Sequence, residues 1–162
     1  MRSRFRRLAP LFCAFLTLAA TTPFAEDAPA APMHKMIRAD QIVWGVGPSS
    51  LPPGGQIAVI LGDPSQPAPF TIRAKLPARY RVAPHWHPGD ENVTVLSGTV
   101  AMGMGEKFDE KALMALPVGG FAAMPANARH FFTTRTAAVI QVHGMGPFVV
   151  NYVNPADDPR NK

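Results

Sequence analysis

Apolar and polar residues alternate along much of this chain, in short runs that glycine and proline separate. In residues 70–76 every second side chain is apolar, which is the period of a half-buried β-strand. The mostly apolar run 56–61 follows the turn-forming sequence Pro-Pro-Gly-Gly and predicts a buried strand. Similar patterns predict further strands over residues 41–46, 80–87, 99–103, 121–125, 129–135, 137–143 and 148–153. No stretch has the pattern of a long amphipathic helix, so we expect an all-β antiparallel barrel.

Two segments carry more specific expectations. Trp44, within residues 41–46, is expected to fill part of the core. Residues 106–114 hold five charged side chains, which predicts a short helix or a mobile flap between neighbouring strands.

The first 25 residues have the layout of a secretory signal peptide. Four arginines precede an apolar run over residues 8–20, which is too short to span a bilayer comfortably. We therefore expect export to the periplasm and no membrane attachment once the signal is removed, with a retained amphipathic anchor as the alternative. Residues 26–40 form a predicted flexible leader, residues 41–154 the barrel domain and residues 155–162 a polar C-terminal tail. The single cysteine, Cys13, lies within the signal, so the exported chain contains no cysteine for disulfides or thiolate chemistry.

Removal of the signal changes the charge of the protein. The whole chain has a formal net charge of +5, but four of its sixteen basic residues and none of its eleven acidic residues lie in the signal. The exported chain then has twelve basic residues against eleven acidic ones, and no basic run remains. This pattern argues against nucleic acid as a partner.

One short stretch carries most of the candidate chemistry, namely His-Trp-His-Pro-Gly-Asp-Glu at residues 85–91. His85 and His87 point to the same side if the segment is extended, because side chains on a strand alternate between its faces. Pro88 and Gly89 suit a bend that brings Glu91 back toward them. Two imidazoles and a carboxylate on one spot are ligands that suit a divalent first-row metal, with iron, manganese, nickel, copper and zinc all compatible.

The spacing of these residues resembles the first sequence motif of the cupin superfamily. The positions that carry this motif are His85, His87, Glu91 and Gly98. A second run is similar to the second cupin motif, and its positions are Gly119, Pro125, Asn127 and His130. The resemblance covers residues 56–153 and implies a double-stranded β-helix, or jelly-roll barrel, with one metal ion held inside by three histidines and one glutamate. It thus adds His130 to the predicted metal ligands His85, His87 and Glu91.

Three positions depart from the motifs. Arg79 stands where a glycine is expected six residues before His85, and Asn127 replaces the glycine that would follow the motif proline. Asn tolerates a positive φ angle, which makes the second change mild. Thr134 replaces the asparagine that would end the second motif.

The resemblance makes a metal-dependent oxidoreductase of the dioxygenase type the first expectation for function, acting on a small organic molecule. A metal-dependent lyase or isomerase and a non-catalytic protein that binds a metal or ligand are the alternatives, because one fold hosts many chemistries. Besides an enzyme and a binding protein, the third class of function is a structural barrel that forms a homodimer through its strand edges. His143, the fifth histidine, either faces the cavity as a general base or lies at the surface. No catalytic residue is assigned from the sequence.

Overall fold

The computed structural model describes residues 34–162, of which Lys35–Lys162 form a compact unit. The predicted signal peptide and most of the predicted leader lie outside the described residues. None of the helices within residues 34–162 has the length and apolar character that crossing a membrane requires.

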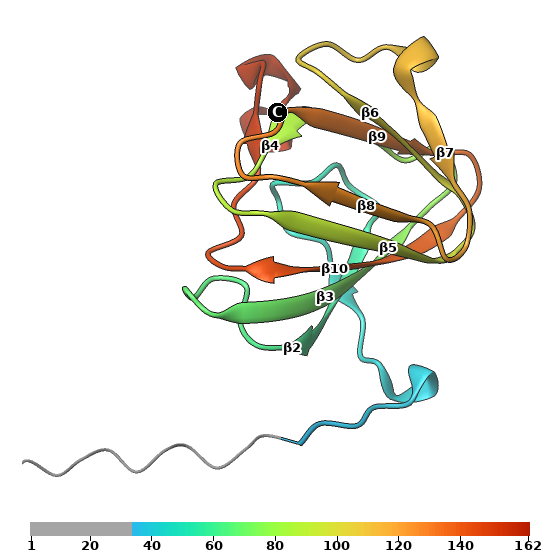
Figure 1. Ribbon diagram of the computed structural model, residues 1–162, viewed down its shortest axis with the longest axis vertical. Coiled ribbons are helices and arrows are strands. Elements are labelled where there is room, and N and C mark those ends of the chain that lie inside the picture. Colours follow the sequence, from blue (N-terminus) through green and yellow to red (C-terminus); the bar gives the residue numbers. More distant parts are fainter. Residues whose placement is uncertain (1–33) are drawn as a thin grey trace, which may run out of the picture. The chain divides into compact units, whose positions relative to one another are not determined.

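Two antiparallel β-sheets make up this unit, as the alternating pattern predicted (Figure 1). The larger sheet contains, in spatial order, β1 (Gly45–Val46), β2 (Gln56–Leu61), β3 (Pro69–Leu76), β10 (Ala138–Met145), β5 (Glu91–Ser97) and β8 (Phe121–Met124). The smaller sheet contains β11 (Asn151–Tyr152), β4 (Arg81–Trp86), β9 (His130–Thr134), β6 (Val100–Met104) and β7 (Met114–Leu116). The helices are short 3₁₀ turns, namely η1 (Ala39–Gln41), η2 (Glu110–Ala112), η3 (Pro155–Asp157) and η4 (Pro159–Asn161).

The core lies between the two sheets and follows the period of two. In β3 the predicted apolar residues Phe70, Ile72, Ala74 and Leu76 are all buried. They join a cluster that also takes side chains from the smaller sheet, including Val82 of β4. Burial of this apolar surface is the main force that holds the two sheets together.

The segment before β2 differs from its prediction. Only Gly45–Val46 of the predicted strand 41–46 pairs with β2, and the preceding residues Ala39–Gln41 form the 3₁₀ turn η1. Trp44 does not fill the core: it is half-buried, and the Lys75 Nζ atom lies 4.3 Å from its ring centroid. The prediction of a core tryptophan was wrong, because a two-residue edge strand does not carry the ring between the sheets.

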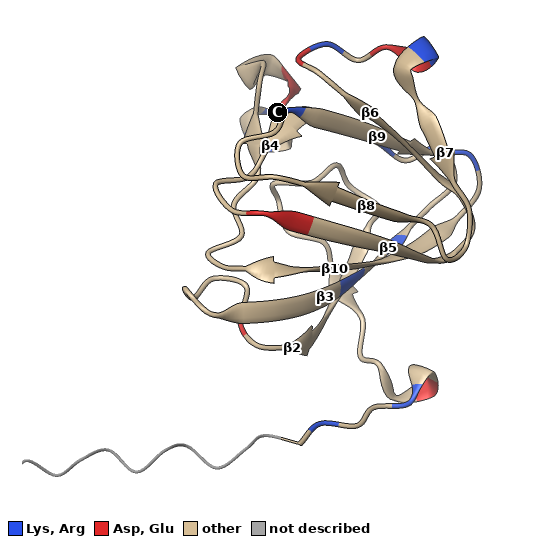
Figure 2. Cartoon of the chain, in the orientation of Figure 1, with Lys and Arg blue, Asp and Glu red and all other residues tan. Residues whose placement is uncertain are grey.

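The charged segment between β6 and β7 contains the short helix η2, one of the two predicted outcomes. Figure 2 shows charged residues gathered along this connection and around η1, whereas the strands carry few of them. Phe108 anchors the connection, because its ring lies 4.8 Å from that of Phe131 and the Arg81 guanidinium carbon lies 3.6 Å from its centroid. The connection therefore covers the outer face of the smaller sheet.

Candidate metal centre

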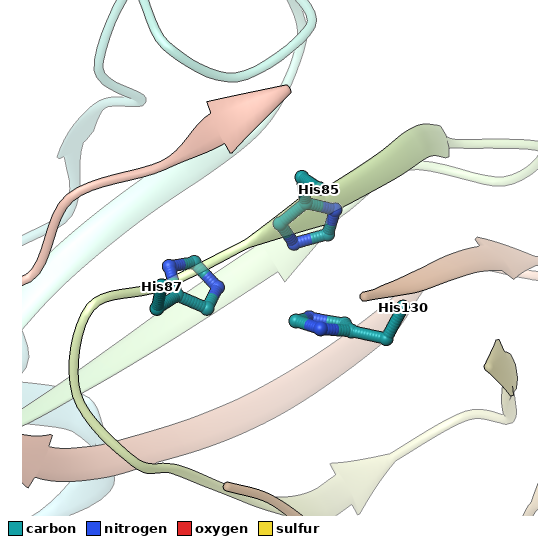
Figure 3. Close-up of side chains that lie close together, drawn as sticks. All are labelled: His85, His87 and His130. Atoms are coloured by element: carbon teal, nitrogen blue, oxygen red, sulfur yellow. The ribbon is translucent and has the colours of Figure 1, made fainter. Parts of the chain in front are cut away.

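Strand pairing brings together the residues of the two motifs. His85 lies near the end of β4 and His87 just beyond it, while Glu91 is the first residue of β5. His130 opens β9, and its Cα is the register partner of that of His85. All four side chains are buried. The candidate ligand atoms of His85, His87 and His130 lie within 4.8 Å of one another, and Figure 3 shows the three rings turned toward one another.

The Nδ1 atom of each imidazole faces a backbone carbonyl oxygen. His85 Nδ1 lies 2.8 Å from the Ala83 oxygen, and His87 Nδ1 lies 2.7 Å from the Val149 oxygen. His130 Nδ1 lies 3.1 Å from the Ala128 oxygen. A carbonyl oxygen only accepts hydrogen bonds, so Nδ1 donates in each case and Nε2 keeps its lone pair in the neutral ring. Such a second hydrogen bond is how proteins orient histidines that bind metal.

The carboxylate of Glu91 faces these free nitrogen atoms. Its Oε2 atom lies 3.1 Å from His130 Nε2 and 3.4 Å from His87 Nε2. Neither Glu91 Oε2 nor His87 Nε2 has a hydrogen-bond partner among residues 34–162. A carboxylate oxygen and a neutral Nε2 are both acceptors, so a cation is needed among them. A single proton bridges only two atoms, whereas a metal ion can use all three nitrogens and the carboxylate, so the residues present fit a metal.

The electrostatics of the site favour the protonation states that metal binding needs. Burial, and then the nearby His130 and His87, lower the pKa of His85 to about 3, which keeps that ring neutral. Burial on its own would raise the pKa of Glu91. Where the facing Nε2 atoms of His130 and His87 carry protons, their hydrogen bonds and charge outweigh burial and lower the pKa of Glu91 below its ordinary value. A metal ion in place of those protons would favour the ionised carboxylate in the same way.

Aromatic side chains surround the histidines. The Phe148 ring stacks on that of His87, with centroids 4.3 Å apart and an interplanar angle of 21°. The rings of Tyr152 and Phe132 lie 6.0 and 6.4 Å from that of His85. This apolar shell limits the access of water and strengthens electrostatic interactions at the site.

A cavity of about 490 Å³ adjoins the site, and His85, His87 and Glu91 form part of its wall. The rest of the wall is mainly apolar and includes exposed residues such as Val46 and Pro48, so the cavity is open to solvent. Its volume lies in the range of small-molecule sites. A larger depression of about 790 Å³ runs past Arg81 and Phe108 but includes none of the four candidate ligands. The cavity beside the histidines is therefore the candidate ligand site.

His143 does not belong to the site. It lies on β10 next to the buried Val142, and its own side chain is exposed. Because neighbouring residues on a strand face opposite ways, His143 points away from the interior, which excludes the first of its two predicted roles.

Sequence reasoning missed two partners of His87, the Phe148 ring and the Val149 carbonyl. Both belong to the segment between β10 and β11, about sixty residues further along the chain. A backbone carbonyl carries no sequence signal, and the spacing of the two motifs does not extend to this segment.

Comparisons with known proteins agree on the fold. No protein-family model and no curated protein matches the sequence. A candidate acetylacetone dioxygenase from Methylibium petroleiphilum is similar in structure, with a TM-score of 0.60, 20% identity, and coverage of 79% of this chain and 86% of the other. The polyketide cyclase RemF from Streptomyces resistomycificus gives a TM-score of 0.62 at 15% identity, covering 80% and 92%. An RmlC-like cupin from Shewanella frigidimarina gives a TM-score of 0.55 at 9% identity, covering 70% and 91%. The chain has the cupin fold.

Proposed function

Starting from the cupin fold, we propose that this chain is a periplasmic metal-dependent enzyme of the dioxygenase type that acts on a small organic molecule. The observation that carries the proposal is the convergence of three imidazoles and one carboxylate beside a cavity that is open to solvent. His85, His87, His130 and Glu91 are the proposed ligands of one divalent ion of iron, manganese, nickel, copper or zinc.

The residues of the chain have distinct tasks in this proposal. The three imidazoles offer Nε2 atoms whose orientation is fixed by carbonyls of the backbone. A bound metal supplies Lewis acidity, and a redox-active one also exchanges electrons with oxygen. The apolar wall holds the substrate beside the site and keeps bulk water away from it.

A second candidate function is a metal-dependent reaction without an oxidant, such as that of a lyase or isomerase. The likeness to the polyketide cyclase RemF favours this alternative, because it is as high as the likeness to the candidate dioxygenase. A non-catalytic protein that binds a metal or ligand is the third possibility, and substrate turnover distinguishes it from both enzymes.

The proposal is tested on protein purified from the periplasm of its own host. Mass spectrometry should find a new N-terminus between Thr21 and Asp27, and elemental analysis should find about one transition-metal ion per chain. Oxygen uptake is then measured with small oxygen chelators as substrates. Product formation without oxygen uptake would favour the lyase or isomerase, and an intact Met1 held at the membrane would contradict export. Absence of metal at neutral pH would contradict the proposed site.

A further inference from the structure

We infer that the substrate is a singly charged oxygen chelator whose remaining part is uncharged and apolar. This inference rests on the proposed function, since it assumes a metal ion at the histidines. Beyond the atoms of the substrate that bind the metal, the cavity wall limits which chemical groups the substrate can carry.

The cavity wall is poor in charged groups. Its ionisable side chains are those of His85, His87 and Glu91, and its other polar side chains are Ser50 and Ser65. Among residues 34–162, no lysine or arginine lines it. A carboxylate or phosphate on the distal part of a substrate would find no cation there, and an ammonium group would find no carboxylate except the proposed ligand Glu91. Burial of such an unpaired charge is costly.

The charge of the site sets the charge of the metal-binding end. A divalent ion with an ionised Glu91 and three neutral imidazoles carries one net positive charge. One anionic group on the substrate neutralises this charge inside the apolar surroundings, whereas a second anionic group would leave the site with an excess negative charge. Enolised dicarbonyl compounds and deprotonated hydroxamic acids have this single charge and two oxygen donors.

The apolar part of the wall indicates what the rest of the substrate is like. Ile72, Ile140 and Val142 of the larger sheet face Phe132 of the smaller sheet, and Phe148 lies beside His87. These side chains offer aliphatic and aromatic surface to the ligand, and its burial is favourable in proportion to the apolar area removed from water. A ring or short alkyl chain fits this wall.

Val59 of β2 makes the inference testable by a change of charge. It lines the cavity, yet its side chain is 49% exposed, so a longer side chain can be placed there without disturbing the core. Val43 is 87% exposed and is not part of the wall, so it provides a matched control.

The experiment uses the zinc-loaded full chain and three hydroxamic acids with the same chelating group. Calorimetry should show benzohydroxamic acid binding at least about tenfold more tightly than acetohydroxamic acid, because its ring is buried. The compound with a carboxylate at the 4-position of the ring should bind at least about tenfold more weakly than benzohydroxamic acid. Val59→Lys should raise the affinity for this carboxylate compound about threefold or more, because it offers a cation, and Val43→Lys should not.

The outcomes separate this inference from the proposed function. If the hydroxamic acids bind with no preference for the uncharged ring, the inference is wrong and the metal site stands. Equal effects of Val59→Lys and Val43→Lys would also overturn it. A chain that takes up no zinc, or a zinc-loaded chain that binds none of the three acids, would overturn the proposed function and the inference with it.

Discussion

At the scale of single residues, the site depends on which nitrogen of each histidine is free. Three backbone carbonyls accept hydrogen bonds from the Nδ1 atoms, so three Nε2 lone pairs are left, and those of His130 and His87 lie near the Glu91 carboxylate. This arrangement is unfavourable without a cation, because buried hydrogen-bond acceptors face one another with no donor between them. Metal binding would relieve the conflict.

Glu91→Gln tests this explanation, because it keeps the shape of the side chain and removes its charge. We expect metal affinity to fall at least about tenfold, since one anionic ligand is lost. At pH 8 the metal-free variant should be as stable as the wild type or about 1 kcal/mol more stable, because the new amide can donate to an Nε2 atom.

Metal competition titration and urea unfolding of the metal-free protein measure the two effects. Glu110→Gln is the matched control: Glu110 is exposed and lies in η2, away from the cavity wall, so this change should affect neither quantity. Unchanged metal affinity in Glu91→Gln would contradict a role for this carboxylate as a ligand.

At the scale of elements, two tyrosines hold the segment between β1 and β2 against the barrel. The Tyr80 hydroxyl donates to the Pro52 carbonyl, and the Tyr152 hydroxyl donates to the Ser50 carbonyl at 2.9 Å. Ser50 and Leu51 line the cavity, so these hydrogen bonds define part of its wall. Tyr152 lies in β11 and Tyr80 directly precedes β4, so these hydrogen bonds connect the smaller sheet to a segment that joins two strands of the larger sheet.

This connection predicts a loss of stability at alkaline pH. Burial raises the pKa of Tyr80 to about 12, whereas the unfolded chain keeps the ordinary value of 10. The unfolded state therefore loses its proton first, so the contribution of Tyr80 is complete below pH 10 and is lost as the pH rises through 12. We expect this loss to be no more than about 2 kcal/mol, because the hydroxyl is only partly shielded from solvent, which screens the charge.

Melting temperature against pH, for wild type and Tyr80→Phe, measures this contribution. The variant should be less stable than wild type at pH 8, by about 1 kcal/mol for the lost hydrogen bond, and should lose less stability above pH 10. Parallel curves from pH 8 to 11.5 would show that ionisation of Tyr80 does not contribute. Tyr152→Phe provides a comparison, because burial raises the pKa of Tyr152 in the same direction.

At the scale of the whole described unit, the candidate site connects the two sheets. His85 and His130 belong to strands of the smaller sheet, whereas Glu91 begins a strand of the larger one. A metal held by these residues would act as a cross-link between the sheets. The assembled site does not exist in the unfolded chain, so the free energy of metal binding adds to that of folding.

We therefore expect metal to raise the melting temperature. At a free metal concentration of 100 times the dissociation constant, the gain is about 2.7 kcal/mol, or roughly 10 °C for a unit of this size. Calorimetry with and without a chelator measures this shift, and re-addition of metal should restore it. A chain that keeps its metal but shows no shift would mean that the ion is bound equally well by the unfolded state.

Local pattern was enough to predict most of the strands and much of their burial, although β7 was not predicted and only two residues each of the predicted strands 41–46 and 148–153 are strand. The alternation in β3 depends only on the period of an extended chain, so its inward face could be read directly from the residues. The same geometry placed His85 and His87 on one side. The spacing of the cupin motifs added His130, which the structure places beside them.

Other features were decided by contacts between distant parts of the chain. Arg79 and Asn127 depart from the motif glycines, yet they have positive φ angles of 61° and 65°. At Arg79 the backbone is held by a hydrogen bond from its N–H to the Thr134 carbonyl, at 2.9 Å. Thr134 also binds this turn through its side chain, which donates to the Pro77 carbonyl. Such a conformation opposes the preference of arginine, so only the tertiary structure could impose it.

The free nitrogen of each candidate ligand also depends on tertiary structure. The residue pattern determined which side chains meet, because strand period and motif spacing are properties of the sequence. The Val149 carbonyl that orients His87 belongs to a segment sixty-two residues away, and it reaches the ring only when both sheets are packed. The exposure of His143 was likewise decided by the packing of β10 between β3 and β5. Backbone groups are the same in every residue, so their partners are settled by packing and not by residue type.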